Sequence, residues 1–394
     1  MKIIQIETIT QIPDIPALSF VRIHTDEGVV GLGETYYTPE SVAAYVHEVI
    51  APVIIGRDPL TDGGIWDDLH ERSARRGGGG TDMRALSAVD LALWDLRGQA
   101  LGVPVHTLLG GSEKPAGVTV YNTCAGTTYS SGSAVGKGTS SDGDDLWMAL
   151  NAPGELATQL VEQGYTGMKV WPFDAYAAAD HGRRIDPDDL RAGVKVIEQI
   201  RDAVGDQINV MMEGHGFWHV DPAARILNAV ADLDIFWAED MIVADDPETI
   251  GALARRTEVP LAVSEYQMGR WQYRRTLETG AVGWLQLDPS WCGGITESQR
   301  ILALASSYGV VAGMHDCTGP MNLLAGLHLA HANGIVGYQE TLRSFLGEVY
   351  PRLVDATFTV TDGRLAAPQR PGLGAALSSR LLDDPRVVRR STTS

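Results

Sequence analysis

Cysteine and basic residues are scarce in this chain of 394 residues. The 3 cysteines form no CxxC pair, so a disulfide framework is not indicated, and we expect reduced thiols packed near strand ends. Lys and Arg number 31 against 50 Asp and Glu, which gives a net charge of −19. Without a basic run, the chain lacks the electrostatic surface that binds nucleic acid or an anionic membrane. We therefore expect neither as a partner.

Long apolar runs are also missing. No stretch reaches the roughly 20 apolar residues of a bilayer-spanning helix, and the first residues lack both the apolar core and the cleavage site of a secretory signal. These absences predict a cytoplasmic protein. Hydrophobic residues make up 44% of the chain and charged residues 21%, which is enough apolar side chain for a large core and, at this length, for two domains.

The first hundred residues predict an α+β unit. Residues 19–34 alternate in polarity on either side of a turn at Asp26-Glu27-Gly28, which predicts a β-hairpin. Residues 81–101 repeat apolar side chains at helical spacing and stop at Gly102, which predicts a long helix. Strands followed by helices are typical of an α+β domain.

From about residue 118 the pattern changes to short apolar runs that alternate with amphipathic segments. Eight buried strands separated by helices predict an α/β fold with a closed parallel barrel rather than an open doubly wound sheet, which usually has fewer strands and a nucleotide loop that is missing here. We expect a first domain at 1–117, a barrel at 118–345, and a segment 346–394 that returns to the first domain. The runs lie at 118–124, 167–171, 208–214, 235–240, 261–265, 282–288, 310–315 and 335–340.

Three segments interrupt or follow this pattern. Residues 126–150 are rich in Gly and Ser and predict a long loop after the first barrel strand, either an active-site lid or an inert insertion. Residues 357–365 resemble a strand. The final residues, 389–394, are expected to fray.

Three glutamates recur at equal spacing. Glu213, Glu239 and Glu265 each end a predicted strand, 26 residues apart in both intervals. Consecutive strand ends of a barrel meet at one rim, where three carboxylates repel one another unless a cation lies between them. An all-oxygen ligand set favours Mg²⁺ over zinc. The alternative is three separate glutamates that are solvated or paired with lysines.

Two further strand ends carry an Asp and a His. Asp288 ends the sixth predicted barrel strand and His315 the seventh, 27 residues later. An Asp that accepts from one imidazole nitrogen orients the other nitrogen toward the pocket and raises its basicity. The pair therefore predicts a general base, against the alternative of a structural histidine.

Other polar residues flank these groups. Lys169 ends the second strand and is expected to neutralise a substrate carboxylate or act in acid-base chemistry, with a salt bridge to a glutamate as its structural role. Glu340 ends the eighth strand and either binds a substrate oxygen or is a solvated rim charge. His215 shares the face of Glu213, and either donates a proton to a departing hydroxyl or makes a supporting hydrogen bond.

Several weaker patterns have mainly structural interpretations. GLGE at 31–34 and RRGGGG at 75–80 lack the features of a nucleotide loop. His215 and His219 are four residues apart, but nearby glycines and Pro222 argue against a helical zinc pair. His328 and His331 are expected at the surface or in packing. Five aromatic residues are candidates for either the pocket wall or the core: Tyr36, Tyr37, Trp171, Tyr266 and Trp291.

The helix ALSAVDLALWDLRGQ at 85–99, the following GVPVHTLLGG at 102–111, and the order of the polar residues resemble the mandelate racemase subgroup of the enolase superfamily. The resemblance implies an α+β capping domain over a modified (β/α)7β barrel with Mg²⁺ ligands on strands three to five. It also implies a small-molecule carboxylate substrate that loses its α-proton to give an enediolate held by Mg²⁺, helped by Lys169.

Departures from the family pattern favour one branch. The second strand has Lys169-Val170-Trp171 and lacks the second lysine of the racemases, whereas Glu213-Gly214-His215 is similar to the acidic-x-His arrangement of the acid-sugar dehydratases. The resemblance therefore implies that His315 takes the C2 proton and His215 helps expel the 3-hydroxyl, giving a 2-keto-3-deoxy acid from an aldonate or aldarate. Glu at 213 and Met241 stand where Asp and Pro are commoner.

Two other functions stay open. An isomerase on the same scaffold, either an epimerase or a cycloisomerase of a sugar acid, uses Lys169 against His315. A non-catalytic relative is expected to have lost ligands that this chain retains. We expect a homo-oligomer, and the sequence does not identify the sugar acid.

Overall fold

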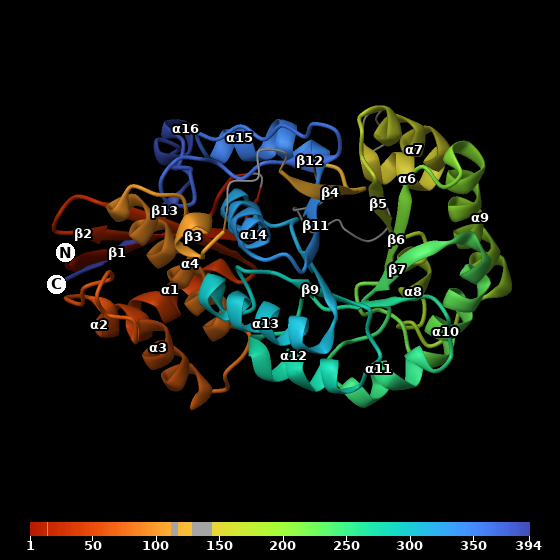
Figure 1. Ribbon diagram of the computed structural model, residues 1–394, viewed down its shortest axis with the longest axis horizontal. Coiled ribbons are helices and arrows are strands. Elements are labelled where there is room, and N and C mark those ends of the chain that lie inside the picture. The colour runs from red at the N-terminus through yellow and green to blue at the C-terminus, as the bar shows by residue number, and fades with distance from the viewer. Residues whose placement is uncertain (14, 112–116, 128–143) are drawn as a thin grey trace.

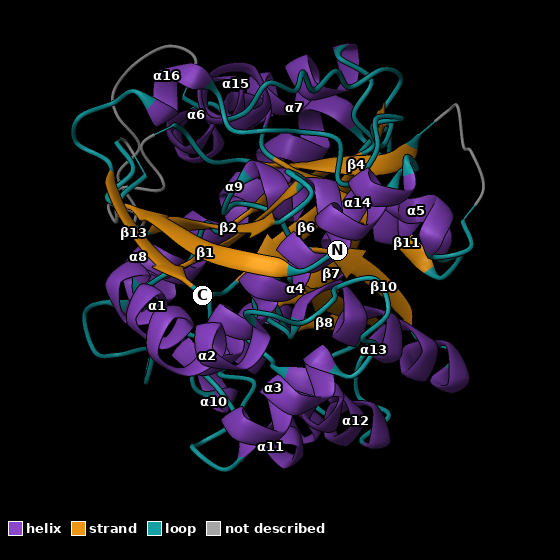
Figure 2. Ribbon diagram, turned by 90° about the vertical axis from the view of Figure 1, so that its left-hand side faces the viewer, coloured by secondary structure: helices purple, strands orange, loops and turns teal. Residues whose placement is uncertain are grey.

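Two structural parts lie side by side in the computed structural model, which describes residues 1–13, 15–111, 117–127 and 144–394. Figure 1 shows an antiparallel sheet with its helices on the left and a barrel on the right. The chain termini lie together at the far edge of the sheet. Figure 2 looks onto this sheet, with the barrel behind it.

The N-terminal part is an antiparallel sheet covered by helices. The strands lie in the order β13-β1-β2-β3, with β1 at Ile3–Thr10, β2 at Leu18–Thr25, β3 at Val30–Tyr36 and β13 at Val388–Thr393. The predicted hairpin is confirmed, because β2 pairs with β3 across the turn that contains Gly28. The helices are α1 (Pro39–Tyr45), a π-helical turn (Val46–Ile50), α2 (Ala51–Ile54), α3 (Ile65–Ala74), α4 (Thr81–Leu101) and α5 (Val105–Leu108).

Helix α4 is the long helix that the sequence predicts, and Gly102 ends it with a left-handed backbone. It packs so closely on β3 that a side chain at Gly31 would clash with the carbonyl oxygen of Ala92, and one at Gly33 with that of Ala88. The GLGE segment therefore serves helix-sheet packing, since only glycine permits this approach. This contact holds α4 in the position from which it reaches the barrel.

The C-terminal part is a closed barrel of eight parallel strands, which confirms the predicted α/β fold with a modified (β/α)7β barrel under an α+β cap. Neighbouring strands pair in chain order, and pairing of the last strand with the first closes the ring. The strands are β4 (Val118–Thr123), β5 (Gly167–Val170), β6 (Asn209–Glu213), β7 (Ile235–Glu239), β8 (Leu261–Val263), β9 (Trp284–Leu287), β10 (Val311–Met314) and β11 (Val336–Thr341).

Helices follow seven of these strands and form the outer layer of the barrel, visible as an arc in Figure 1. Their apolar faces pack against the strands, as expected for amphipathic crossover helices. They are α6 (Asp145–Asn151), α7 (Pro153–Glu162), α8 (Asp174–Ala177), α9 (Pro187–Val204), α10 (Val220–Ala229), a 3₁₀ turn (Ala231–Leu233), α11 (Pro247–Ala254), α12 (Gly269–Glu278), α13 (Gly294–Tyr308) and α14 (Pro320–Ala332).

Large side chains fill the barrel interior. Tyr121, Trp237 and Tyr338 are buried together and meet edge to face or at a tilt, with Met211 and Ala262 beside them. The interior is therefore a packed core rather than a channel. Trp237 also donates from its indole nitrogen to Glu239 at 3.1 Å, so the core supports a side chain at the strand ends.

The last fifty residues correct two predictions. Residues 389–394 do not fray: β13 pairs with β1 from Val388 to Thr393, because this pairing satisfies backbone groups at an otherwise open sheet edge. The strand predicted at 357–365 is reduced to β12 (Arg364–Leu365), which pairs with β4. A π-helical turn (Phe345–Val349), α15 (Tyr350–Leu353) and α16 (Ser379–Leu382) complete this segment. The domain boundaries at residues 117 and 345 stay a prediction.

The predicted loop at 126–150 is shorter than expected, since Asp144 caps α6 through bonds from Leu146 and Trp147 and the helix then runs to Asn151. The choice between an active-site lid and an inert insertion concerns mainly residues 128–143, which lie outside the described residues. Within the described part of the chain, no helix combines the length and apolar character needed to cross a lipid bilayer. Cytoplasmic location and homo-oligomer formation stay predictions.

A buried histidine, His328, connects helix α5, helix α14 and the segment at Leu373. The backbone N–H of His106 in α5 donates to Nδ1 of His328 in α14, and Nε2 of His328 lies 3.2 Å from the carbonyl oxygen of Leu373. This arrangement fits a neutral ring, because a proton on Nδ1 would face the His106 N–H. Burial lowers the pKa of His328 to about 3. The interpretation of His328 as a packing residue is confirmed.

We predict that His328 makes folding sensitive to acid. Below the ordinary pKa of about 6.5, His328 binds a proton in the unfolded chain, whereas in the folded chain it stays neutral until about pH 3. Between these values, the free energy of unfolding therefore falls by about 1.4 kcal/mol from this group for each unit by which the pH is lowered. Urea unfolding at pH 7.5, 6.0 and 5.0 measures the slope. His328→Gln should reduce it by about that amount, whereas the exposed control His219→Gln should not. An unchanged slope in His328→Gln contradicts this account.

Candidate active site

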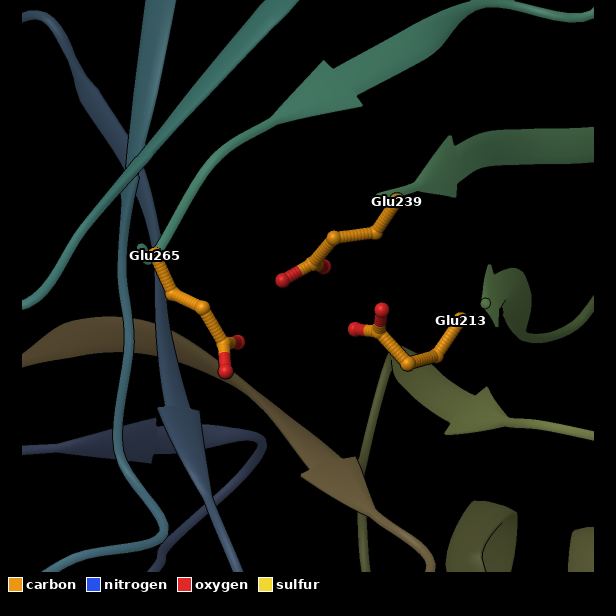
Figure 3. Close-up of side chains that lie close together, drawn as sticks. All are labelled: Glu213, Glu239 and Glu265. Atoms are coloured by element: carbon orange, nitrogen blue, oxygen red, sulfur yellow. The ribbon is translucent and has the colours of Figure 1, made fainter. Parts of the chain in front are cut away.

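Three glutamates converge at the carboxyl ends of the barrel strands. Glu213 ends β6 and Glu239 ends β7, where the two residues are paired in register, and Glu265 lies two residues beyond β8. One carboxylate oxygen from each lies within 4.8 Å of the others, and all three side chains are buried. Figure 3 shows the carboxylates pointing toward a common centre from three separate strands. The predicted convergence is confirmed.

Lys169 at the end of β5 lies against this group. Its Nζ is 3.0 Å from carboxylate oxygens of Glu213, Glu239 and Glu340. Burial lowers the pKa of Lys169, but Glu239 and Glu340 raise it more, so that it ends well above its ordinary value. The salt bridge considered as the structural role of Lys169 is therefore present, and it leaves a cation at the centre of the rim.

The glutamates fit a hard divalent cation. They offer only oxygen atoms, which suits Mg²⁺. Glu213 Oε2 is buried and accepts no hydrogen bond from any described residue, although it forms an ion pair with Lys169 at 3.0 Å. Its other oxygen, Oε1, accepts from the backbone N–H groups of Gly214 and His215, which fixes the direction of the carboxylate. Glu213, Glu239 and Glu265 are the residues that would hold the metal.

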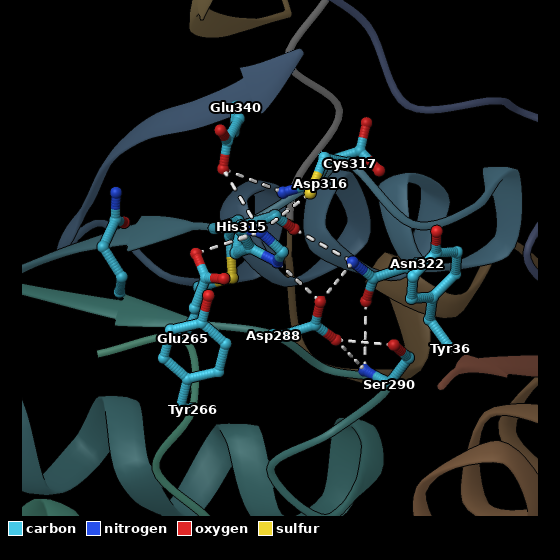
Figure 4. A network of polar contacts seen from close by, with 12 residues as sticks. Tyr36, Glu265, Tyr266, Asp288, Ser290, His315, Asp316, Cys317, Asn322 and Glu340 are labelled. Carbon is cyan, nitrogen blue, oxygen red and sulfur yellow. Dashed lines mark hydrogen bonds and ion pairs between the residues drawn. The ribbon is translucent and has the colours of Figure 1, made fainter. Parts of the chain in front are cut away.

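On the opposite side of Glu265, Asp288 and His315 form the predicted pair. Nδ1 of His315 lies 2.7 Å from Oδ2 of Asp288, and both side chains are buried. Asp288 also accepts from the hydroxyl of Ser290 at 2.6 Å and from the amide nitrogen of Asn322 at 3.1 Å. Figure 4 shows this network around the imidazole. Asp288 is therefore held in place and fixes the orientation of His315.

The second imidazole nitrogen of His315 faces the site. Nε2 lies 3.1 Å from Oε2 of Glu265 and 3.3 Å from Sγ of Cys317. Burial lowers the pKa of His315, but the charges of Glu265 and other neighbours raise it well above its ordinary value. The imidazole is thus protonated while its Nε2 faces the Glu265 carboxylate. A ligand that neutralises Glu265 frees this nitrogen to accept a proton.

His215 has its own carboxylate partner. Its Nδ1 lies 2.5 Å from Oδ2 of Asp174 at the start of α8, and Trp171 packs edge-on against the imidazole with ring centres 5.5 Å apart. Burial lowers the pKa of His215, but the charges of Asp174 and Glu213 raise it to about 9. At neutral pH this imidazole carries a proton that it can donate.

Glu340 is not the solvated rim charge that the sequence leaves open. It is 1% exposed because strand β11 closes the barrel beside β4 and turns the side chain inward. Burial raises its pKa, but Lys169 and His315 lower it more, so the net shift is downward. Glu340 accepts from Thr123 and from the backbone N–H of Asp316. It is an ionised group that helps to hold Lys169.

Sequence reasoning misses three residues of the site: Asp174, Asp240 and Asn322. Asp174 begins the short helix α8, four residues after β5 ends, so only its place near a strand end hinted at it. Asp240 follows Glu239 directly, and burial raises its pKa well above its ordinary value. Ser264 donates to Asp240 at 2.7 Å. Asn322 lies in the first turn of helix α14, and no sequence pattern there marks it as a partner of Asp288.

The five candidate aromatic residues gather near the two histidines. Trp171 contacts His215, and the ring of Trp291 lies 5.1 Å from that of His315. Tyr266 stacks on Trp291, and Tyr37 from the cap packs against Trp291 and Tyr36. Figure 4 shows Tyr266 beside Glu265 and Tyr36 on the side of Asn322. The aromatic residues therefore form a wall shared by the cap and the barrel.

Two protein-family models match this chain, one in the cap and one in the barrel. Residues 8–110 match the N-terminal domain of mandelate racemase / muconate lactonizing enzyme, and residues 153–381 match the enolase C-terminal domain-like family. The chain belongs to the mandelate racemase subgroup of the enolase superfamily. The family resemblance of the sequence is confirmed, and the family is one of enzymes.

Several individual proteins are similar to this chain in sequence, and solved structures are similar to it in fold. The chain is 31% identical to D-galactonate dehydratases from Pectobacterium atrosepticum and Verminephrobacter eiseniae, over 97% of this chain and 94% of each relative. A solved enolase of the mandelate racemase subgroup from Agrobacterium tumefaciens is 36% identical with a TM-score of 0.88, over 100% of this chain and 99% of that one. A putative dehydratase from Zymomonas mobilis is 27% identical with a TM-score of 0.88, over 100% of both chains.

We predict that Mg²⁺ stabilises the folded chain through the three glutamates. A ligand that binds only the folded state at 100 times its Kd adds about 2.7 kcal/mol, so the melting temperature should rise with Mg²⁺. Glu265→Gln should remove most of this rise, because the site loses one charged ligand. Glu258→Gln, at an exposed glutamate three residues before β8 begins, is the matched control. Thermal unfolding that is insensitive to Mg²⁺ in the unaltered chain contradicts the metal assignment.

Proposed function

We propose that this protein is a dehydratase of sugar acids, which removes the proton α to a carboxylate and expels the 3-hydroxyl to give a 2-keto-3-deoxy acid. The observation that carries the proposal is a pair of histidines near the same carboxylate cluster. His315 is oriented by Asp288 and His215 by Asp174. One imidazole placed to accept a proton and one placed to donate a proton are what an elimination of water needs.

The substrate carboxylate is expected to bind at the carboxylate cluster beside Lys169. Loss of the α-proton adds a second negative charge to an already anionic acid, so positive charge nearby decides the rate. A divalent cation held by Glu213, Glu239 and Glu265 would supply most of that charge when bound. Lys169 orients the carboxylate from the other side, and the glutamates keep the lysine charged.

The acid and base have separate places in the site. His315 accepts the C2 proton at Nε2, while Asp288 on Nδ1 stabilises the imidazolium that forms. His215 donates a proton to the departing 3-hydroxyl, and Asp174 holds the imidazole for this step. The aromatic wall around Trp291 excludes water from the base. Names of the relatives agree with this reaction class, since several are called D-galactonate dehydratase.

The isomerase alternative needs Lys169 as an acid-base group opposite His315. Its ammonium contacts three carboxylates, and its pKa is raised well above the ordinary value. An ammonium with a carboxylate oxygen 3.0 Å away on three sides is placed as a held charge rather than as a second base. Dehydration uses it only as a charge, which its surroundings favour.

Turnover of a panel of aldonates and aldarates with Mg²⁺ tests the function. We expect a 2-keto product that reacts with semicarbazide, lost with a chelator and lost in His315→Asn because the base is gone. An epimer of the substrate without a keto product supports the isomerase instead. Turnover that survives both the chelator and His315→Asn contradicts the mechanism.

We predict that Asp174 positions His215 for the leaving-group step only. Asp174→Asn should lower the dehydration kcat by about 10- to 100-fold, a part of the usual general-acid contribution. Exchange of the C2 hydrogen in deuterated water should persist, because His315 rather than His215 moves that proton. Asp180→Asn, nearer the surface of the same region and paired with Arg184, is the control. If exchange and dehydration fall equally, Asp174 has a general structural role.

A further inference from the structure

A buried guanidinium lies in the cap beside the active site without a carboxylate partner. Arg84, in the first turns of α4, is only 9% exposed. Its Nη1 donates to the carbonyl oxygen of Tyr36 at 3.1 Å, and among the described residues no Asp or Glu forms a salt bridge with it. An enclosed charge that lacks a counter-ion is costly to fold. Most other buried charges of this site do have charged partners.

The position of Arg84 connects it to the reacting groups. Its guanidinium carbon lies 4.2 Å from the ring centre of Trp291 and 5.0 Å from that of Tyr37. Trp291 in turn packs against His315. Burial lowers the pKa of Arg84, while Asp288, Tyr37 and Glu265 act in the opposite direction, so the carboxylate that orients His315 and a candidate metal ligand are within electrostatic reach of Arg84.

A second polar group near Arg84 also lacks a partner. Trp291 is 1% exposed, and its indole N–H finds no acceptor among the described residues. A buried N–H without an acceptor is uncommon in folded proteins. Arg84 from the cap and Trp291 from the segment between β9 and α13 therefore both offer donors where the cap meets the barrel, beside the groups for the reacting carboxylate.

From this arrangement, and resting on the proposed function, we infer that Arg84 and Trp291 bind a second carboxylate at the far end of the substrate. The substrate class is then the aldarates, which carry a carboxylate at both ends, rather than the aldonates, which end in a neutral hydroxymethyl group. A guanidinium fork matches a carboxylate in two parallel hydrogen bonds. The distal carboxylate also supplies the counter-ion that Arg84 lacks.

The test uses matched pairs of hexonates and hexarates that have the same configuration and differ only at C6. The unaltered enzyme with Mg²⁺ should show the higher kcat/KM for the hexarate of its preferred pair. In Arg84→Gln, the ratio of hexarate to hexonate kcat/KM should fall about 10- to 100-fold, the range for a hydrogen bond to a charged group. The loss should appear mainly in KM, because the distal group does not react.

Arg97→Gln is the matched control, since Arg97 is on the same helix, lies over Trp94 and donates to a backbone carbonyl, that of Pro59. Its substrate ratio should equal that of the unaltered enzyme. If Arg84→Gln does not fold, as judged by circular dichroism, Arg84→Lys serves instead. It keeps the charge but loses the fork, and its ratio should fall about 10-fold.

Hexarate binding to His315→Asn, measured by calorimetry, gives a readout without turnover. Binding should be tighter than that of the matched hexonate, and a second substitution of Arg84 should remove the difference. A preference of the unaltered enzyme for hexonates, or a ratio that Arg84→Gln leaves unchanged, overturns the inference while the dehydratase function stands. Turnover of neither class overturns both.

Discussion

Repulsion between buried carboxylates is the constraint on which the rest of the active site depends. Glu213, Glu239, Glu265 and Glu340 crowd one end of the barrel, and each is 5% exposed or less. Water screens them poorly there, so each needs nearby positive charge. Lys169 contacts three of them and His315 the fourth. The same negative field that attracts a metal cation raises the pKa values of Lys169, His315 and His215.

The cap does more than cover this site. Glu34 at the end of β3 accepts from the backbone N–H of Asn322 at the start of α14, a favourable place for a carboxylate. Burial raises the pKa of Glu34 to about 8. Asn322 donates in turn to Asp288, which orients His315. The cap and the general base are thus joined by consecutive hydrogen bonds, so displacement of the cap would disturb the base.

Sequence periodicity predicts the parts of this protein that repeat. From β6 to β11 each barrel unit places a strand end about 24 to 27 residues after the previous one, which is why Glu213, Glu239 and Glu265 could be assigned to one rim. The pairing of β13 with β1 was not predictable in this way, because an edge strand of Arg, Ser and Thr has no apolar alternation. The positions of Asp174 and Arg84 at the site depend on which helices pack against the carboxyl ends of the barrel strands, and no local sequence pattern predicts that packing. Burial of Glu340 follows from closure of the barrel.

A crystal structure of the His315→Asn variant grown with Mg²⁺ and a sugar acid would test the central claim most directly. The account predicts a cation bound by Glu213, Glu239 and Glu265, with the substrate carboxylate beside it and Lys169 turned toward that carboxylate. Glutamates that hold only Lys169, with the cation or the sugar acid bound elsewhere, would contradict it.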